Sequence, residues 1–198
     1  MKKNKKAAIE LSIGTVVIIV LAMSMLVLGI ALIRNIFKGA TGVVDLSNDK
    51  VLEEITSLFS DEGSDIVVKL GADQTAKIKQ DSGPFSVGIG ARKTDRSAIT
   101  AADDIKYKIT LDEDTPGNCY QVYGDTETEK LFLTPLGTPD RRFDKFEGSQ
   151  AFAVIQLNVP DAVPLCTQKV YIEVKETGES SYYAGNYFIV EIQEKGFF

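Results

Sequence analysis

The stretch LSIGTVVIIVLAMSMLVLGIALI, residues 11–33, determines how the rest of this chain is organised. No charged residue occurs between Glu10 and Arg34. An α-helix over these residues would be about 34 Å long, which is enough to cross the roughly 30 Å hydrocarbon core of a bilayer. The sequence therefore predicts a hydrophobic helix over residues 11–37, which either stays in lipid or is buried against other helices.

The charges on the two sides of this helix predict its orientation in a membrane. Residues 1–10 contain four lysines, whereas only Arg34 and Lys38 closely follow the apolar run. The positive-inside rule then places the N-terminus in the cytoplasm. We expect a single-pass membrane protein with an extracellular C-terminal domain. A secretory signal cleaved behind the helix fits less well, because its apolar region is usually about 7–15 residues long.

The junction between the basic segment and the helix carries a family resemblance. Residues 5–10, KKAAIE, followed by LSIGTVVII, resemble the class III signal of archaeal type IV pilins and archaellins. In that family a prepilin-type signal peptidase cuts on the cytoplasmic side, and the helix stays on the mature protein. The resemblance implies cleavage after Ala7, with Ala8 as the new N-terminus and with Lys5 and Lys6 as the preceding basic residues.

Three residues would contribute to helix assembly under this resemblance. Glu10 would be the third mature residue, and a carboxylate in apolar surroundings needs a partner. The freed α-amine of a neighbouring subunit could supply it; alternatively, Glu10 lies at the headgroup level of the membrane. Gly14 and Gly29 would let apolar helices approach closely, although small residues are also common in spanning helices.

The resemblance implies a structural function. The chain would be a subunit of an extracellular pilus- or archaellum-like filament, polymerising through its N-terminal helix after cleavage. Its partners would be the membrane before assembly, the signal peptidase, and copies of itself in a helical filament at the cell surface. The alternative is a monomeric membrane-anchored surface protein, such as an adhesin or a ligand-binding module.

Composition narrows the remaining function classes. The 198-residue chain has no histidine, which removes the commonest general base near neutral pH and the commonest metal ligand. No nucleophile or paired-carboxylate motif stands out, so we predict a protein that is not an enzyme and needs no cofactor. Residues 1–38 hold six basic side chains and one acidic, so the remainder carries −11 of a total charge of −6. Such an acidic domain is a poor nucleic-acid binder.

Two regions follow the helix. Residues 38–63 are predicted as a helical neck or linker. Gly39 and Gly42 fit a linker, and an amphipathic helix behind them either extends the first helix or packs on the next domain. The apolar positions of this second helix fit one helical face: Val51, Leu52, Ile55, Leu58 and Phe59.

From about residue 64 the pattern changes to alternating apolar and polar residues, as at 85–89 and 105–111. Eight or nine short strands separated by turn signals predict an antiparallel immunoglobulin-like β-sandwich over residues 64–198. The expected fold class is mainly β with a long N-terminal α-helix. Two of the expected strands lie at 120–122 and 130–134, the second inside a polar insert.

Two cysteines, Cys119 and Cys166, lie in the part of the chain placed outside the cell. A single extracytoplasmic pair predicts a disulfide. Two cysteines without a histidine do not suit zinc, and no metal site is predicted.

An acidic turn offers one weak metal alternative. Asp112, Asp114 and Asn118 could supply oxygen ligands to calcium, but the full spacing of an EF-hand loop is absent. The adjacent Pro116-Gly117 pair favours an exposed type II turn instead.

Tyrosines cluster near the C-terminus at Tyr182, Tyr183 and Tyr187. They could contact a neighbouring subunit, but aromatic residues in a sandwich more often form core or cross-strand pairs.

Overall fold

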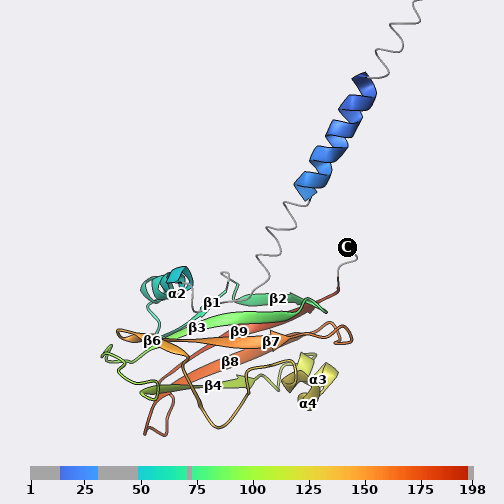
Figure 1. Ribbon diagram of the computed structural model, residues 1–198. Helices are drawn as coiled ribbons and strands as arrows, with labels where there is room; N and C mark the ends of the chain where they lie inside the picture. Colours follow the sequence, from blue (N-terminus) through green and yellow to red (C-terminus); the bar gives the residue numbers. More distant parts are fainter. Residues whose placement is uncertain (1–13, 31–48, 71–72, 196–198) are drawn as a thin grey trace, which may run out of the picture. The chain divides into compact units, whose positions relative to one another are not determined.

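The computed structural model describes residues 14–30, 49–70 and 73–195 of the chain. Two compact units are present, Met1–Thr41 and Gly42–Phe198. Figure 1 colours the described parts along the sequence, from the blue helix of the first unit to the red C-terminal strand of the second.

In the first unit, residues 14–30 form a continuous α-helix. The helix predicted over residues 11–37 extends beyond the described residues at both ends. Among the residues that the structure describes, no helix combines the length and the apolar character that a membrane crossing requires.

The second unit contains two β-sheets (Figure 1), which we call sheet A and sheet B. Sheet A has the strand order β1-β3-β7-β6, and sheet B has the order β2-β9-β8-β4-β5. The strands of sheet A are β1 (Ile66–Lys69), β3 (Pro84–Arg92), β6 (Lys145–Glu147) and β7 (Gln150–Asn158). Those of sheet B are β2 (Thr75–Lys79), β4 (Ile105–Leu111), β5 (Arg141–Arg142), β8 (Thr167–Glu176) and β9 (Ala184–Gln193). Neighbouring strands are antiparallel, except that β2 runs parallel to β9.

Alternation along the strands builds one core between the sheets. In β8, Val170, Ile172 and Val174 are fully buried, whereas the residues between them are partly exposed. The same buried cluster takes side chains from both sheets, including Ile89 of β3 and Ile155 of β7. The prediction of a mainly β, sandwich-like domain is therefore confirmed. The last two strands, β8 and β9, pair antiparallel within sheet B.

Helix α2 (Asp49–Glu62) packs on sheet A. Its apolar face forms a second buried cluster with Val67 and Phe152 of that sheet. Of the two alternatives for this segment, the structure thus has the helix packed on the β domain, inside the unit that begins at Gly42. The residues that α2 contributes are Leu52, Ile55 and Phe59.

Gly90 of β3 lets α2 approach the sheet. A Cβ atom at this position would lie 2.6 Å from Cγ2 of Ile55 and 3.0 Å from Cε2 and Cζ of Phe59. Both side chains are almost completely buried, so neither can move aside without disturbing its neighbours. The contact between α2 and sheet A therefore depends on residue 90 being a glycine, which has no side chain.

Two predicted strands are wrong. Residues 120–122 belong to helix α3 (Cys119–Tyr123), because Asn118 caps the helix by accepting a hydrogen bond from the Gln121 amide. Helix α4 (Asp125–Glu129) follows at once. In the segment 130–134 only Phe132 makes an isolated bridge, to Leu157. Three to five alternating residues are too few to distinguish a strand from a helical turn next to a cap.

Gly90→Ala should lower the free energy of unfolding by about 1–3 kcal/mol, because the added methyl overpacks the contact with α2. The measurement is urea unfolding of the full-length chain in detergent. Gly185→Ala is the matched control, since an added Cβ there would meet only the Ile172 carbonyl oxygen, at 3.6 Å. Equal stabilities for the two variants would contradict the close approach.

Candidate functional site

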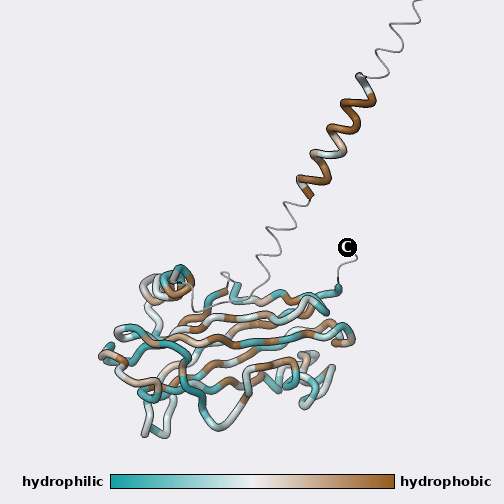
Figure 2. Tube along the Cα trace, viewed as in Figure 1, coloured by the Kyte–Doolittle hydropathy of each residue, from teal (hydrophilic) through white to brown (hydrophobic). Residues whose placement is uncertain are grey.

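The helix of residues 14–30 presents an apolar surface. It contains no charged residue, and Figure 2 shows it coloured as hydrophobic along most of its length. Its large apolar side chains are exposed, from Ile30 at 45% to Met25 at 73%, and only Gly29 is half-buried. The Ser24 hydroxyl donates to the Val20 carbonyl oxygen at 2.7 Å within the helix. An apolar surface of this extent is typical of a helix covered by lipid or by other helices.

Gly14 and Gly29, two of the predicted assembly residues, lie on this helix. An added Cβ would meet no atom within 4 Å at either position. With 3.6 residues per turn, the two glycines lie only about 60° apart around the helix axis, and Ala22 lies within about 80° of Gly14. Ile18 and Met25 lie on the same arc, so the three small residues leave gaps between two large side chains on this side of the helix.

The other residues predicted for processing and assembly are Lys5, Lys6, Ala7, Ala8 and Glu10. They lie outside the described residues.

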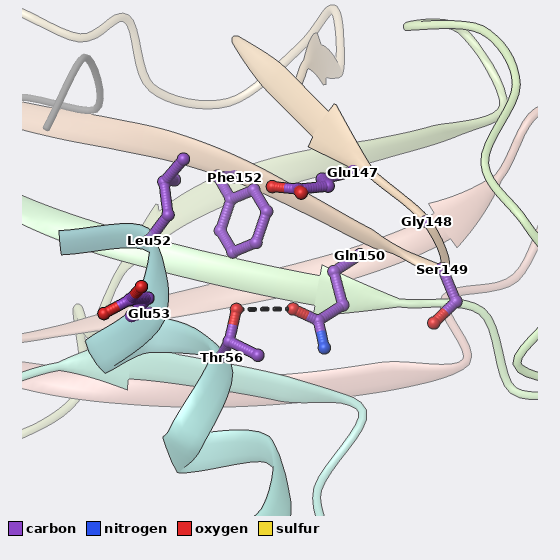
Figure 3. Close-up of a pocket in the computed structure, with 8 residues that line it drawn as sticks. All are labelled: Leu52, Glu53, Thr56, Glu147, Gly148, Ser149, Gln150 and Phe152. Carbon is purple, nitrogen blue, oxygen red and sulfur yellow. Dashed lines mark hydrogen bonds between the residues drawn. The ribbon is translucent and has the colours of Figure 1, made fainter. Parts of the chain in front are cut away.

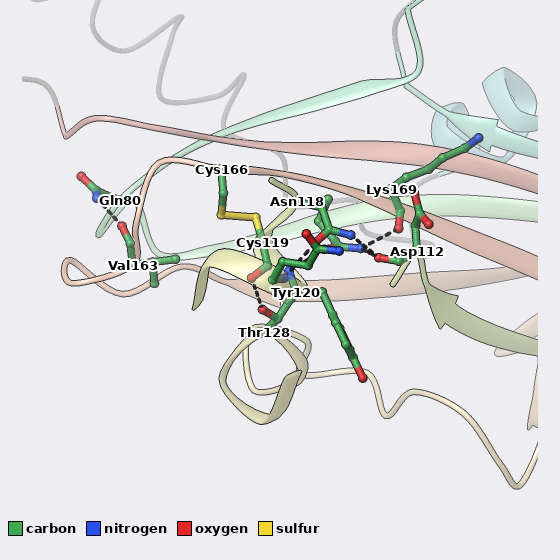
Figure 4. Close-up of a disulfide and its surroundings, with 11 residues drawn as sticks. Gln80, Asp112, Asn118, Cys119, Tyr120, Thr128, Val163, Cys166 and Lys169 are labelled. Carbon is green, nitrogen blue, oxygen red and sulfur yellow. Dashed lines mark hydrogen bonds between the residues drawn. A yellow bond between two sulfur atoms is a disulfide. The ribbon is translucent and has the colours of Figure 1, made fainter. Parts of the chain in front are cut away.

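The predicted disulfide is confirmed. Cys119 and Cys166 are bonded, with their Cα atoms 5.1 Å apart (Figure 4). Cys119 is fully buried, and the exposed fraction of Cys166 is 9%. The bond joins the start of α3 to the residue that precedes β8. Next to it, Asn118 and Thr167 form a parallel bridge, so covalent and backbone contacts hold the same corner.

Gln168 satisfies the polar groups beside the disulfide. Its buried amide nitrogen Nε2 donates to the carbonyl oxygens of Asp112, at 2.7 Å, and Lys169, at 3.1 Å. Its Oε1 accepts from the Tyr120 amide at 3.0 Å. Thr128 Oγ1 donates to the Cys119 carbonyl oxygen at 3.0 Å. Sequence reasoning missed Gln168, whose only signal is a polar residue at an inward position of a strand.

Of the three residues weighed for calcium, the side chains of Asp112 and Asn118 are hydrogen-bonded within the turn, and Asp114 contributes its backbone amide. Asp112 accepts hydrogen bonds from the Asp114 amide and the Thr115 hydroxyl, and the latter is the main cause that lowers the pKa of Asp112 below its ordinary value. Asn118 Nδ2 donates to the Asp112 carbonyl oxygen at 2.6 Å. The described residues contain no group of three or more His, Cys, Asp or Glu side chains that could hold a metal ion.

The expected type II turn is also present there. The Asn118 amide donates to the Thr115 carbonyl oxygen at 3.2 Å, and Gly117 has φ +77°. This positive φ at the third residue of the turn is what a type II turn requires.

A groove lies between α2 and the turn that joins β6 to β7 (Figure 3). The Thr56 hydroxyl donates across it to Gln150 Oε1 at 2.8 Å. Its lining provides carboxylates, hydroxyls and one amide, which can donate and accept hydrogen bonds. The lining residues are Leu52, Glu53, Thr56, Glu147, Gly148, Ser149, Gln150 and Phe152.

A charged cluster around Asp140 fastens the polar insert to sheet B. Lys175 Nζ lies 2.5 Å from Asp140 Oδ2, and the Tyr182 hydroxyl donates to Asp140 Oδ1 at 2.8 Å. The ammonium groups of Lys175 and Lys108 lie 5.2 and 5.8 Å from the Tyr182 ring centroid. Burial and the hydrogen bond to Asp140 raise the pKa of Tyr182 to about 12.

The pKa of Asp140 is shifted in the opposite direction. Burial alone would raise it, but the hydrogen bonds from Lys175 and Tyr182 outweigh burial and leave the pKa below its ordinary value of 3.8. The carboxylate is therefore stabilised in its charged form.

The structure separates the three clustered tyrosines. Tyr182 contacts Asp140, whereas the Tyr183 hydroxyl donates to the Arg92 carbonyl oxygen at 2.9 Å, and burial raises the Tyr183 pKa. Tyr187 pairs across strands with Tyr171 on the outward face of sheet B. The cross-strand alternative is thus confirmed for Tyr187.

Replacing both cysteines with serine should lower the free energy of unfolding by about 4 kcal/mol, because the bond closes a loop with a sequence separation of 47 residues. Urea unfolding with and without a thiol reductant measures it. The reductant should lower the stability of the wild type toward that of the variant and leave the variant unchanged. A variant as stable as the oxidised wild type would refute this role.

Asp140→Asn should destabilise the domain at pH 7 by about 1–3 kcal/mol, through loss of hydrogen bonds to a charged group. Because the folded pKa of Asp140 is lowered, its contribution is complete above about pH 4 and disappears as the pH falls through the folded value. The stability difference between wild type and variant should therefore shrink in acid, measured by unfolding between pH 3 and pH 7. Tyr182→Phe, which removes one hydrogen bond, should show a smaller change; a pH-independent difference would exclude the ionic contribution.

Comparisons with known proteins assign no family. No family model matches the chain, and no curated protein matches it. Among solved structures, the GspB Siglec domain is similar with a TM-score of 0.40 and 11% identity, over 66% of this chain and 58% of that domain. A PapD-like domain of human CEP192 has a TM-score of 0.37 and 10% identity, over 67% and 86% of the two chains. A Niemann-Pick type C2 protein from the Japanese carpenter ant has a TM-score of 0.34 and 12% identity, over 66% of this chain and 90% of that protein. At these scores, the similarities carry no argument about function.

Proposed function

We propose that this chain is the structural subunit of an extracellular pilus- or archaellum-like filament, which polymerises through its N-terminal hydrophobic helix. The observation that carries the proposal is the uncharged, exposed helix of residues 14–30, which belongs to a different compact unit from the β domain. Such a surface needs apolar surroundings. Lipid provides them before assembly, and the helices of other copies provide them afterwards.

The basic segment accounts for the order of events. Its four lysines hold the N-terminus at the cytoplasmic face of the membrane, and they would be costly inside a bundle of apolar helices. Cleavage after Ala7 removes all four. Glu10 then forms an ion pair with the new α-amine of a neighbouring subunit, which compensates for burying its carboxylate.

The side of the helix with Gly14, Ala22 and Gly29 supports close packing between copies. In apolar surroundings, van der Waals contact and not the exclusion of water drives helix association. Gaps at Gly14, Ala22 and Gly29 can accept large side chains of a neighbouring helix, so we place the contact surface in the filament core on this side.

We infer that the β domain has an immunoglobulin-like arrangement. The orders β1-β3-β7-β6 and β9-β8-β4 match the ABED and CFG sheets of such sandwiches, if the strands are lettered in chain order and β2 and β5 are left out as additions. The disulfide differs from the usual bond between strands B and F, because it joins the insert after β4 to the start of β8. The presence of a disulfide and the net negative charge of the β domain both suit a domain that coats the outside of a filament in the extracellular space.

The processing step gives the sharpest test. In the native host, mass spectrometry of the mature protein should find Ala8 at the N-terminus, and negative-stain imaging of a sheared surface fraction should show filaments. Lys6→Glu combined with Ala7→Ile should leave the N-terminus uncleaved and abolish filaments, because the peptidase no longer meets a basic and small pair. Lys2→Glu is the control, since it leaves that pair intact.

A second pair of variants separates assembly from anchoring. Gly14→Leu with Gly29→Leu keeps the helix apolar but fills the gaps at the two glycines, so the protein should remain in the membrane fraction and disappear from the sheared fraction. Val20→Leu, an exposed apolar exchange on the same helix, should leave filaments intact. Surface protein that retains Met1–Lys6, with no filaments in the wild type, would refute the proposal in favour of a monomeric anchored protein.

A further inference from the structure

The outward face of sheet B carries a row of side chains across three strands. In the observed register, Thr110 of β4 lies opposite Tyr171 of β8, which lies opposite Tyr187 of β9. A depression of about 420 Å³ is present at this row. We call it the tyrosine cup. Its lining is Thr110, Tyr171, Ile172, Glu173, Gly185, Asn186 and Tyr187.

Gly185 leaves space in the cup. The next row across the sheet consists of Lys108, Glu173 and Gly185, so the last position contributes no side chain. An added Cβ at Gly185 would be in ordinary contact with a single atom, and the backbone φ is not in the positive range that favours glycine. Neither packing nor backbone conformation therefore requires a glycine at position 185. The effect of the glycine is to leave the space above it open.

A lysine holds the two tyrosine rings. Lys169 Nζ lies 4.0 Å from the ring centroid of Tyr187 and 4.9 Å from that of Tyr171. Cation–π contacts at these distances fix the rings without covering both of their faces. Tyr187 keeps 39% of its surface exposed. The cup therefore has a pre-positioned aromatic wall that is open to solvent.

Polar groups complete the lining. Among the described residues, no ion pair joins Glu173 to a lysine or arginine, and the ammonium group of its cross-strand neighbour Lys108 lies over the Tyr182 ring. The Glu173 carboxylate can therefore accept hydrogen bonds from a ligand. The Thr110 hydroxyl can donate and accept, and the Lys169 ammonium can donate.

We propose that the tyrosine cup binds a pyranose unit of a glycan. A pyranose has an apolar C–H face, which packs on an aromatic ring, and a rim of hydroxyls that need both donors and acceptors. Tyr187 and Tyr171 supply the ring surface, Glu173 and Thr110 of the lining supply hydrogen bonds, and the Lys169 ammonium beside the rings supplies a further donor. A cationic ligand fits less well, because the Lys169 ammonium lies against both rings and repels it.

This activity is independent of helix assembly, since all of the lining residues lie in the β domain. The protein could bind glycans either as an anchored monomer or as a filament subunit. A result that excludes glycan binding by the tyrosine cup would therefore leave the proposed structural function unaffected. A result that excludes filament formation would likewise leave glycan binding unaffected.

The test uses the full-length chain in lauryl dimethylamine oxide, a detergent without a sugar headgroup. Saturation-transfer NMR with the methyl glycosides of glucose, galactose, mannose and N-acetylglucosamine should show transfer to at least one of them. Tyr187→Ala should weaken that binding by roughly tenfold or more, and Gly185→Leu should abolish it by filling the cup. Lys79→Ala, an exposed change on the edge strand β2, is the matched control and should bind like the wild type.

Thermal unfolding of each variant guards against loss of fold, and Gly185→Ala provides a smaller filling change with an intermediate loss of binding. Absence of transfer to all four glycosides would overturn the proposal. So would equal transfer to wild type and folded Gly185→Leu, since that result would place the sugar elsewhere on the surface. Loss of saturation transfer in Tyr187→Ala and Gly185→Leu, with transfer retained in Lys79→Ala, would support the proposal.

Discussion

Burial of alternating apolar side chains between the two sheets is the constraint on which the β domain depends. Every inward position of β8 from Val170 to Val174 is closed to solvent, so every intervening side chain must face outward. This fixed alternation places the side chains of Lys169, Tyr171 and Glu173 on the same outward face of sheet B. The tyrosine cup and the Asp140 cluster are therefore both consequences of a core that leaves its strands no freedom to shift register.

The sequence was sufficient for features that depend on local pattern. Alternation at 85–89 and 105–111 predicted β3 and β4, the pair Pro116-Gly117 predicted the turn, and a single cysteine pair predicted the disulfide. Helix α3 was missed because one capping hydrogen bond, donated by the Gln121 amide to Asn118 Oδ1, outweighs a short alternating run. Local pattern is ambiguous when the segment is only a turn or two long.

Contacts between distant positions could not be predicted. Gly90 looks like any glycine in a strand, and its role depends on Ile55 and Phe59, which lie on a helix more than thirty residues earlier. Likewise, Asp140 meets Tyr182 only because the insert folds back over sheet B. Gly14 and Gly29 could be placed on a helix from the apolar run alone, whereas their role in assembly stays a prediction.

The disulfide also determines what a cut in the polar insert can do. The insert that begins at Gly124 lies inside the loop that Cys119 and Cys166 close. A protease that cuts this insert separates the chain into two pieces, yet the bond still holds the pieces together. The strand pairs β3–β7 and β4–β8 join the same two pieces, so a nicked domain stays linked both covalently and through its sheets.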